Sequence, residues 1–450
     1  MSLWKRSRWP LRAAAGLGAL WLASAAQAQH ASPSAHASSP SAPAADPFTK
    51  APVLERGELL RQVLERNPGL EAARAGWQAA LAGPEQATAW EDPMLRYEVA
   101  PLSLFSRHEV HPGHTVALSQ RVPFPGKRGL AGEVARAEAE AARGDYEAAR
   151  LRLGLMASML YDDLYVVNRA LAVNAHHEEV LREMRRGAEA QYVAGRASQQ
   201  DPLQAEVELG MLERERLTME AEREELQAQL NGLLHRPAHL PLPPPPARLE
   251  VSTEPPPPAQ ELTEEALRTR PELTGMRARV GGSEAAVGLA QRESLPDVRV
   301  MGSYSSMWAE VPHRLMVGVE LEVPLFQGPR RARVVEAEAM RTRMRSEASH
   351  LAADVGVEVT RARARLVEAL KALTLYRDRL VPAANDQVTA ARAGFESGRN
   401  GFQVLLDAEK NQRGVELRFE EAVADVQRRR AELEWTLGRM PGLTSEGGTR

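Results

Sequence analysis

Two stretches of this sequence, 203 residues apart, share the pattern of a helix, a glycine-centred turn and a second helix. The first is YVAGRASQQDPLQAEVE from residue 192, and the second is FESGRNGFQVLLDAEKN from residue 395. Residues at matching positions include Gly195 with Gly398, Leu203 with Leu406, Ala205 with Ala408, and Glu206 with Glu409. A fold proposed for this chain must therefore contain the same helical corner twice.

The same offset continues far beyond the two corners. Pro68 matches Pro271, Pro93 matches Pro296, and Leu230 and Leu234 match Leu433 and Leu437, all 203 residues apart, whereas Pro123 and Pro324 differ by 201. Self-similarity on this scale indicates two copies of one structural unit. We predict a first repeat at residues 57–235 and a second at residues 259–440.

The segments outside the repeats indicate export. Four basic residues (Lys5, Arg6, Arg8 and Arg12) precede an apolar run over residues 13–26, and AQA follows at residues 26–28. This is the pattern of a cleaved signal peptide at residues 1–28, because fourteen apolar residues are fewer than the ~20 of a spanning helix. We expect an extended Ser/Ala/Pro-rich leader at 29–56, a Pro-rich linker at 236–258 and a flexible tail at 441–450.

Each repeat is expected to run helix, strand, loop, strand, very long helix, glycine turn, helix. Residues 128–192 contain no proline, and their apolar residues recur every three or four positions, at Leu153, Met156, Leu160, Leu164, Val167 and Leu171. The matching residues 330–395 contain Pro382, where we expect a kink. Each helix would be about 100 Å long, which predicts coiled-coil packing against neighbours.

Four short segments alternate apolar and polar residues with period two, as strands with one apolar face do. Leu95, Tyr97 and Val99 alternate with Arg96 and Glu98, and residues 115–122 and 298–304 follow the same rule. In residues 314–323 the apolar positions are Leu315, Val317, Val319, Leu321 and Val323. Such strands occur in half-buried sheets of soluble proteins and in membrane barrels, and the exported chain with two very long helices favours the barrel. Four strands cannot close a barrel, so the chain must oligomerise.

Composition and motifs exclude several classes of protein. The net charge of −3 argues against nucleic-acid binding, and the absence of cysteine excludes disulfides, thiolate metal sites and a lipid-modified cysteine. No catalytic, nucleotide or zinc-protease motif is present, so we predict no enzyme activity, no cofactor and no metal site. The sequence leaves open whether His108, His111 and His114, which lie in one loop, bind a metal ion. His176 and His177 are expected at the surface.

Several segments resemble the TolC-like outer-membrane efflux ducts, or outer-membrane factors. They are NPGLEAARAG, SQRVPFPGKRGLAGEVARAEAEAAR, YVAGRASQQDPLQAEVEL and RPELTGMRARV, and the resemblance covers nearly all of residues 55–440. The VPFPGKR segment at residues 122–128 is similar to the heavy-metal efflux branch. The resemblance implies a mainly α fold with a small transmembrane β part, in a homotrimer that forms a 12-stranded barrel and an α-helical periplasmic tunnel.

The resemblance also implies a function and partners. The chain would be the passive exit duct of a tripartite pump, in contact with outer-membrane lipid, a periplasmic adaptor protein and an inner-membrane transporter of the RND type. Heavy-metal cations are one expected cargo. Drug efflux or type I secretion through the same fold is an alternative, and a soluble periplasmic coiled-coil scaffold is another.

Site residues follow from the same resemblance. The periplasmic tip and adaptor contact would lie at Gly195, Arg196, Gly398 and Arg399, although both glycines are also explained as helix C-caps. The family's aperture positions fall on Val404 and Asp407, so three chains would supply one acidic ring. Asp201 has two readings, pore lining or a carboxylate at a helix N-terminus. The lipid-facing strand would present Leu315, Val317, Val319 and Leu321.

Overall fold

The structure, a computed structural model, describes residues 48, 51–100, 113–306 and 314–442. The chain divides into two units, residues 1–49 and 50–450. Only Phe48 of the first unit is described, so the account below concerns the second. The predicted signal peptide, most of the leader, His108, His111 and nearly all of the tail lie outside the described residues.

The first long helix, α4, spans Lys127–Val193 and confirms the prediction for residues 128–192. Its 67 residues correspond to a length of about 100 Å. The second long segment is divided into α8 (Gln327–Leu375), a π-helical turn η3 (Tyr376–Leu380) and α9 (Val381–Glu396). The kink predicted at Pro382 is therefore observed as a π-helical turn just before this proline. Pro382 has no N–H group, so it cannot continue the α-helical hydrogen bonds.

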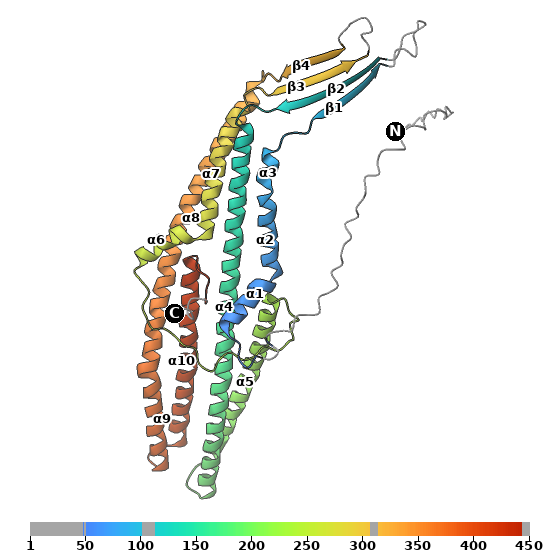
Figure 1. The fold of residues 1–450 in the computed structure, drawn as a ribbon. Helices are drawn as coiled ribbons and strands as arrows, with labels where there is room; N and C mark the ends of the chain where they lie inside the picture. Colours follow the sequence, from blue (N-terminus) through green and yellow to red (C-terminus); the bar gives the residue numbers. More distant parts are fainter. Residues whose placement is uncertain (1–47, 49–50, 101–112, 307–313, 443–450) are drawn as a thin grey trace, which may run out of the picture. The chain divides into compact units, whose positions relative to one another are not determined.

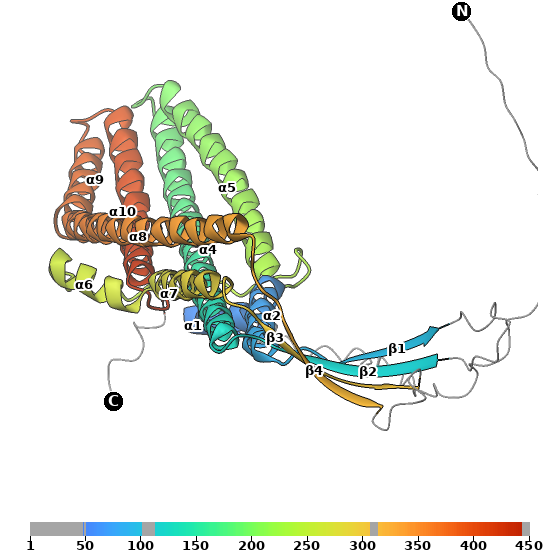
Figure 2. The ribbon, with the colours of Figure 1, turned by 90° about the horizontal axis from the view of Figure 1, so that it is seen from above.

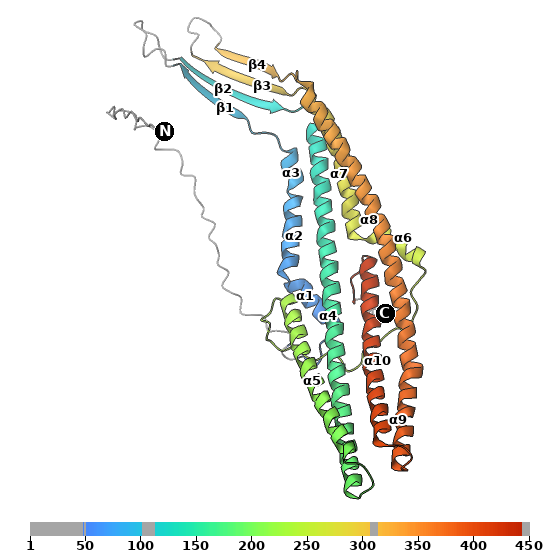
Figure 3. The same cartoon turned by 180° about the vertical axis from the view of Figure 1, so that it is seen from behind.

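Each long helical segment returns through a tight turn into a second helix. The α4 helix pairs with α5 (Gln200–Leu233), and α9 pairs with α10 (Phe402–Thr436). Figures 1 and 3 show both turns at the end of the helices opposite to the sheet. The two hairpins also pack together, because α10 lies against α4.

Five shorter helices complete the helical part. They are α1 (Arg56–Arg66), α2 (Pro68–Leu81), α3 (Gly83–Thr88), α6 (Ala259–Thr269) and α7 (Pro271–Arg292). Asn67 caps α2 by accepting hydrogen bonds from the N–H groups of Gly69 and Leu70. The backbones of α7 and α4 approach closely, since a Cβ on Gly144 would lie 2.8 Å from the Cα of Gly275.

The strands β1 (Met94–Ala100), β2 (Gly113–Val122), β3 (Val298–Ser305) and β4 (Leu315–Leu321) form one antiparallel sheet in the order β1-β2-β3-β4. The predicted strands are thus confirmed, although β4 ends at Leu321, short of Val323. Strands from the two halves of the sequence meet at the β2–β3 pair. Figure 2 shows the strands running side by side and away from the helices.

The main apolar core joins α6, α8 and α10 to α4. Its fully buried members include Ala266, Val355, Val359, Ala362, Ala424 and Val426. Beside it, the buried carboxylate of Asp162 on α4 accepts hydrogen bonds from the guanidinium of Arg56 on α1. Burial raises the pKa of Asp162 to about 6, although Arg56 acts in the opposite direction. No described helix combines the length and apolar character needed to cross a membrane.

Candidate functional site

The sheet carries its Leu, Val and Tyr residues on one face, because the strand register aligns the alternating patterns of all four strands. Met94, Met301 and Met316 lie on the opposite face. Directly paired residues of an antiparallel sheet project to the same side. Three successive rows run Tyr97–Val116–Tyr304–Leu315, Leu95–Leu118–Gly302–Val317 and Gln120–Val300–Val319. The opposite face carries Arg96, Glu98, Ser119, Arg121, Arg299 and Glu320.

The apolar face is exposed in the single chain. Val317 is 77% exposed and Val319 is 70% exposed, values usual for charged side chains. Leu315 and Leu321 lie on the same face and are also exposed. The four residues predicted to face lipid therefore share one uncovered apolar surface, and their contact with lipid stays a prediction.

Aromatic side chains lie toward one end of this face. Tyr97 and Tyr304 belong to one row, and the Tyr97 hydroxyl lies 2.7 Å from Nδ1 of His114, whose ring stacks on it. One nitrogen of His114 is thus already engaged. Among the described residues, no group of three or more His, Asp or Glu side chains is placed to hold a metal ion.

Asp297 fastens the sheet to the helices at the place where β2 ends and β3 begins. Its carboxylate accepts hydrogen bonds from Arg121 and Lys127, each at 2.7 Å, and from the N–H of Phe124 at 2.8 Å. Burial by itself would raise the pKa of Asp297, but the bonds from Lys127, Phe124 and Arg121 outweigh it and hold the pKa below its ordinary value. No sequence motif marks Asp297, so its role was not predicted.

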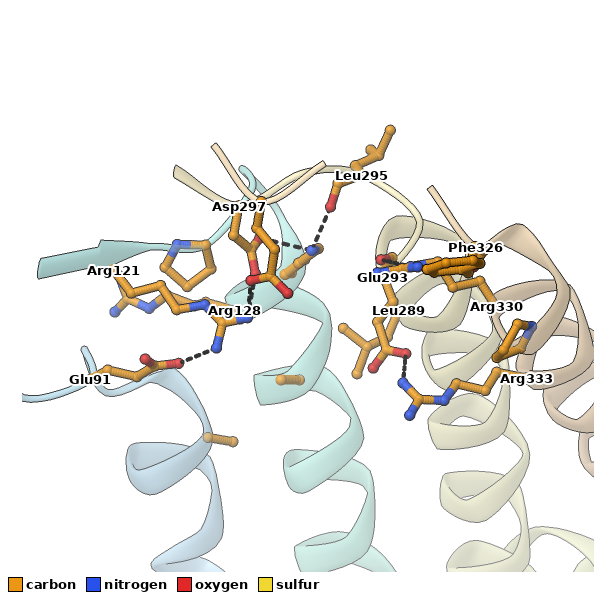
Figure 4. A pocket seen from close by; sticks show the side chains of 16 residues that line it. Glu91, Arg121, Arg128, Leu289, Glu293, Leu295, Asp297, Phe326, Arg330 and Arg333 are labelled. Carbon is orange, nitrogen blue, oxygen red and sulfur yellow. Dashed lines mark hydrogen bonds and ion pairs between the residues drawn. The ribbon is translucent and has the colours of Figure 1, made fainter. Parts of the chain in front are cut away.

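A cavity of about 510 Å³ opens beside Asp297 between the ends of α3, α4, α7 and α8. Its charged lining residues are Glu91, Arg121, Lys127, Arg128, Glu293, Asp297, Glu322, Arg330 and Arg333 (Figure 4). Most are paired: Arg121 contacts Glu91 at 3.2 Å and Arg333 contacts Glu293 at 2.9 Å. Because these cations and carboxylates neutralise one another, the charged lining is best explained as a structural connection between the sheet and the helices.

The two helical corners have the same hydrogen-bonded geometry. At the first, Gly195 has φ 68°, its N–H donates to Tyr192 O, and the N–H of Arg196 donates to Gln191 O. At the second, Gly398 has φ 71°, its N–H donates to Phe395 O, and the N–H of Arg399 donates to Gly394 O. Both are Schellman motifs, so the C-cap reading of the two glycines is confirmed. Their contact with an adaptor is untested.

The predicted aperture residues lie on the first turns of α10. Val404 is 49% exposed, and exposed Asp407 accepts a hydrogen bond from Gln403 at 2.8 Å. Phe402 instead lies inside the chain, with its ring against that of Phe395. Asp201 stands in the first turn of α5, as the N-terminal reading predicted.

The expectation that both His176 and His177 lie at the surface was wrong for His177. Its ring is buried between α4 and α10, with Nε2 3.1 Å from Glu416 and Nδ1 3.9 Å from Glu409. The same face of α10 reaches α5 through Lys410, which contacts Glu208 at 2.6 Å. Helical periodicity alone did not reveal which of two adjacent histidines would meet the second hairpin.

Comparison with known proteins shows which family has a similar sequence. A family described as outer membrane efflux protein matches residues 262–439, which include most of α6, all of α7 to α10 and the strands β3 and β4. This part of the chain is thus similar to outer membrane efflux proteins. This similarity bears out the predicted outer-membrane location and the prediction that the chain is not an enzyme.

One curated relative and several solved structures are also similar to this chain. The chain is 25% identical over 191 residues to the cobalt-zinc-cadmium resistance protein CzcC of Cupriavidus metallidurans, covering 40% of this chain and 43% of CzcC. The alignment therefore spans less than half of that relative. The fold is similar to that of CusC (TM-score 0.73, 17% identity, covering 85% of this chain and 92% of that chain). VceC of Vibrio cholerae gives a TM-score of 0.72 at 17% identity, covering 85% and 96%.

Proposed function

We propose that this protein is the trimeric outer-membrane channel of a tripartite efflux pump, and that it serves as a passive exit duct from the periplasm. The observation that carries the proposal is the register of the sheet, which aligns one exposed apolar face across all four strands. A face of this kind is stable against acyl chains and costly against water.

The dimensions of the sheet support this role. The ten residues of β2 extend about 34 Å, and a tilt of about 40° reduces their height to about 26 Å. The apolar band of outer-membrane barrels is ~25 Å tall and is bordered by aromatic residues, the position that Tyr97 and Tyr304 would take. The β2 strand is thus long enough to span the band without surplus.

The open edges of the sheet support a trimer. In the described sheet β1 and β4 each have one neighbouring strand, so their other edges are unpaired. Unpaired backbone groups are not tolerated in lipid, and three copies would supply twelve strands, enough to close one barrel. The two repeats proposed from the sequence, residues 57–235 and 259–440, would then each contribute a hairpin of strands and a hairpin of helices to the wall.

The opposite end of the molecule fits a contact with a periplasmic adaptor. Gly195 and Gly398 form two equivalent turns, and a Cβ at either would meet open space. With Arg196 and Arg399 beside them, three chains would present six such turns to an adaptor that joins the duct to an inner-membrane transporter of the RND type. Asp407 and Val404, exposed just beyond the second turn, would line the aperture.

We propose heavy-metal cations as the cargo, because the cobalt-zinc-cadmium resistance protein CzcC is similar to part of this chain. A drug or a secreted polypeptide is the alternative within the same fold. Growth assays with a deletion strain distinguish these cargoes: sensitivity to cobalt, zinc or cadmium salts, reversed by the cloned chain, supports the metal. Sensitivity to drugs alone would overturn this part of the proposal and leave the channel intact.

Assembly is tested in detergent. We expect the extracted protein to have the mass of three chains by light scattering, and to form ion-conducting channels in planar bilayers. A stable monomer without conductance would overturn the proposal. Recovery of the protein in soluble extracts without detergent would favour the periplasmic coiled-coil scaffold instead.

A further inference from the structure

The second helical corner carries an Asn-Gly pair that the first corner lacks. Asn400 and Gly401 occupy the positions that Ala197 and Ser198 occupy in the first corner, 203 residues earlier. The backbone follows the same course through both corners, with the same left-handed glycine and the same hydrogen bonds around it. The two corners therefore differ in side-chain chemistry and not in shape.

An asparagine followed by a glycine can modify itself without an enzyme. The backbone nitrogen of the glycine attacks Cγ of the asparagine, a bond between this nitrogen and Cγ forms, and the Cγ–Nδ2 bond breaks as ammonia leaves with the proton of the glycine N–H. Water then opens the cyclic imide at either carbonyl and leaves aspartate or isoaspartate. Glycine favours the ring closure because it has no Cβ to hinder it.

Both reacting groups at the second corner are unrestrained. Gly401 is exposed in an extended conformation, and its N–H donates to no group of the described residues. The half-buried side chain of Asn400 lies against Gly394 and makes no hydrogen bond within the part of the chain that the structure describes. Because α10 begins only at Phe402, the peptide bond between Asn400 and Gly401 lies outside the helical hydrogen bonds.

The other Asn-Gly pair of the sequence lies in a different setting. Asn231 and Gly232 belong to α5, and Asn231 is fully buried. Its amide donates to the carbonyls of Ala238 and Leu240, at 3.0 and 2.7 Å. The N–H of Gly232 is held in the hydrogen bonds of the helix. Ring closure would break these bonds in the interior of the protein, which is costly.

We propose that Asn400 is a site of spontaneous deamidation in the folded protein, whereas Asn231 is protected. Conversion to aspartate places one carboxylate in each chain just before α10, where the positive end of the helix dipole favours negative charge. Conversion to isoaspartate adds one carbon to the backbone between position 400 and α10. The second corner thus changes its charge as the protein ages, and the first does not. This inference depends on the helical corners alone and not on the channel or its cargo.

Mass spectrometry of the purified protein in detergent tests the proposal. The folded protein is incubated in heavy-oxygen water, so that oxygen taken up there is distinguished from oxygen taken up during digestion in ordinary water. Cleavage after glutamate gives the peptides 397–409 and 226–250, which report Asn400 and Asn231 separately. We expect peptide 397–409 to exchange its amide for a heavy hydroxyl and to separate into aspartate and isoaspartate forms, while peptide 226–250 stays unchanged.

Two variants separate the dipeptide from its setting. Gly401→Ala adds a Cβ that meets open space, so it keeps the corner and should slow the reaction. Ala197→Asn combined with Ser198→Gly moves the pair to the first corner, which should then react as well.

The protein unfolded in denaturant provides the reference. There Asn231 should react as fast as Asn400, because only the fold protects it. The proposal is overturned if Asn400 reacts in denaturant but not in the folded protein, if Asn231 reacts as fast as Asn400 in the folded protein, or if Gly401→Ala leaves the rate at Asn400 unchanged.

Discussion

His235 adopts at the end of α5 the left-handed conformation that Gly438 adopts at the end of α10. The φ angles are 52° and 72°. In both motifs the next residue donates its N–H to a carbonyl five residues back, from Arg236 to Asn231 and from Arg439 to Glu434. One corner of the fold is thus built with glycine in one half and with a strained histidine in the other.

We predict that His235→Gly stabilises the protein. Relief of a left-handed non-glycine residue is worth about 1–2 kcal/mol, against about 0.5–1 kcal/mol of added chain entropy, so the unfolding free energy should rise by up to about 1 kcal/mol. Gly438→Ala should instead cost about 2 kcal/mol, since its Cβ would also lie 3.0 Å from Thr269 O. Urea titrations in detergent measure both, and loss of stability in His235→Gly would contradict the reading.

The lipid-facing assignment is tested by two adjacent residues of β4. Val319→Arg should impair membrane insertion, because an arginine on the lipid face near the midplane costs ~2–4 kcal/mol. Glu320→Arg, on the opposite face beside Arg299, should insert and alter conductance. Folding yield in lipid vesicles compares the two, and equal tolerance would show that the faces are wrongly assigned.

The aperture assignment depends on Asp407. In a trimer its three carboxylates would attract cations, so Asp407→Asn should weaken block by divalent cations from the periplasmic side. Three charges at roughly 1 kcal/mol each in water-like surroundings sum to about 3 kcal/mol, so the loss should be about a hundredfold. Gln403→Ala, which removes only the amide bonded to Asp407, should leave the block close to wild type. Planar-bilayer recordings measure the cation block of the wild type and of both variants. An unchanged block in Asp407→Asn would exclude Asp407 as the gate.

Asp162 gives stability an unusual pH dependence. Because burial raises its folded-state pKa from 3.8 to about 6, the folded protein binds the proton more tightly than the unfolded chain does. Stability from this group is therefore fully present below about pH 4 and is lost, by up to about 3 kcal/mol, as the pH rises through 6. Thermal unfolding between pH 4.5 and about 7.5 should show this loss in the wild type relative to Asp162→Asn, and parallel curves would refute it.

The pH dependence of stability that Asp297 contributes is opposite to that of Asp162. Its pKa is lowered in the folded protein, so its contribution is present above the unfolded value of 3.8 and is lost as the pH falls through the lower folded value. At neutral pH, Asp297→Asn should destabilise the protein by about 2–3 kcal/mol, because Lys127 and Arg121 lose their shared carboxylate. A double-mutant cycle with Lys127→Met measures the coupling, and additive effects would show that the contact carries no energy.

Much of the architecture could be predicted from the sequence because its determinants are local. Alternation of apolar and polar residues specified the four strands, and spacing of three or four specified the long helices. Gly195 and Gly398 marked both turns, since a left-handed backbone is strained for residues with a Cβ. Pro382 marked the interruption of the second helix, although the π turn that precedes it was not foreseen.

The tertiary structure decided which of these elements meet, because pairing depends on partners distant in the chain. The β2–β3 register joins residues about 180 positions apart and alone determines that the apolar faces coincide. Asp297 became a joint only when three donors from another segment surrounded it, and His177 became buried only when α10 packed on α4. A sequence determines what each segment prefers, whereas burial and charge pairing arise from long-range contacts that no local pattern encodes.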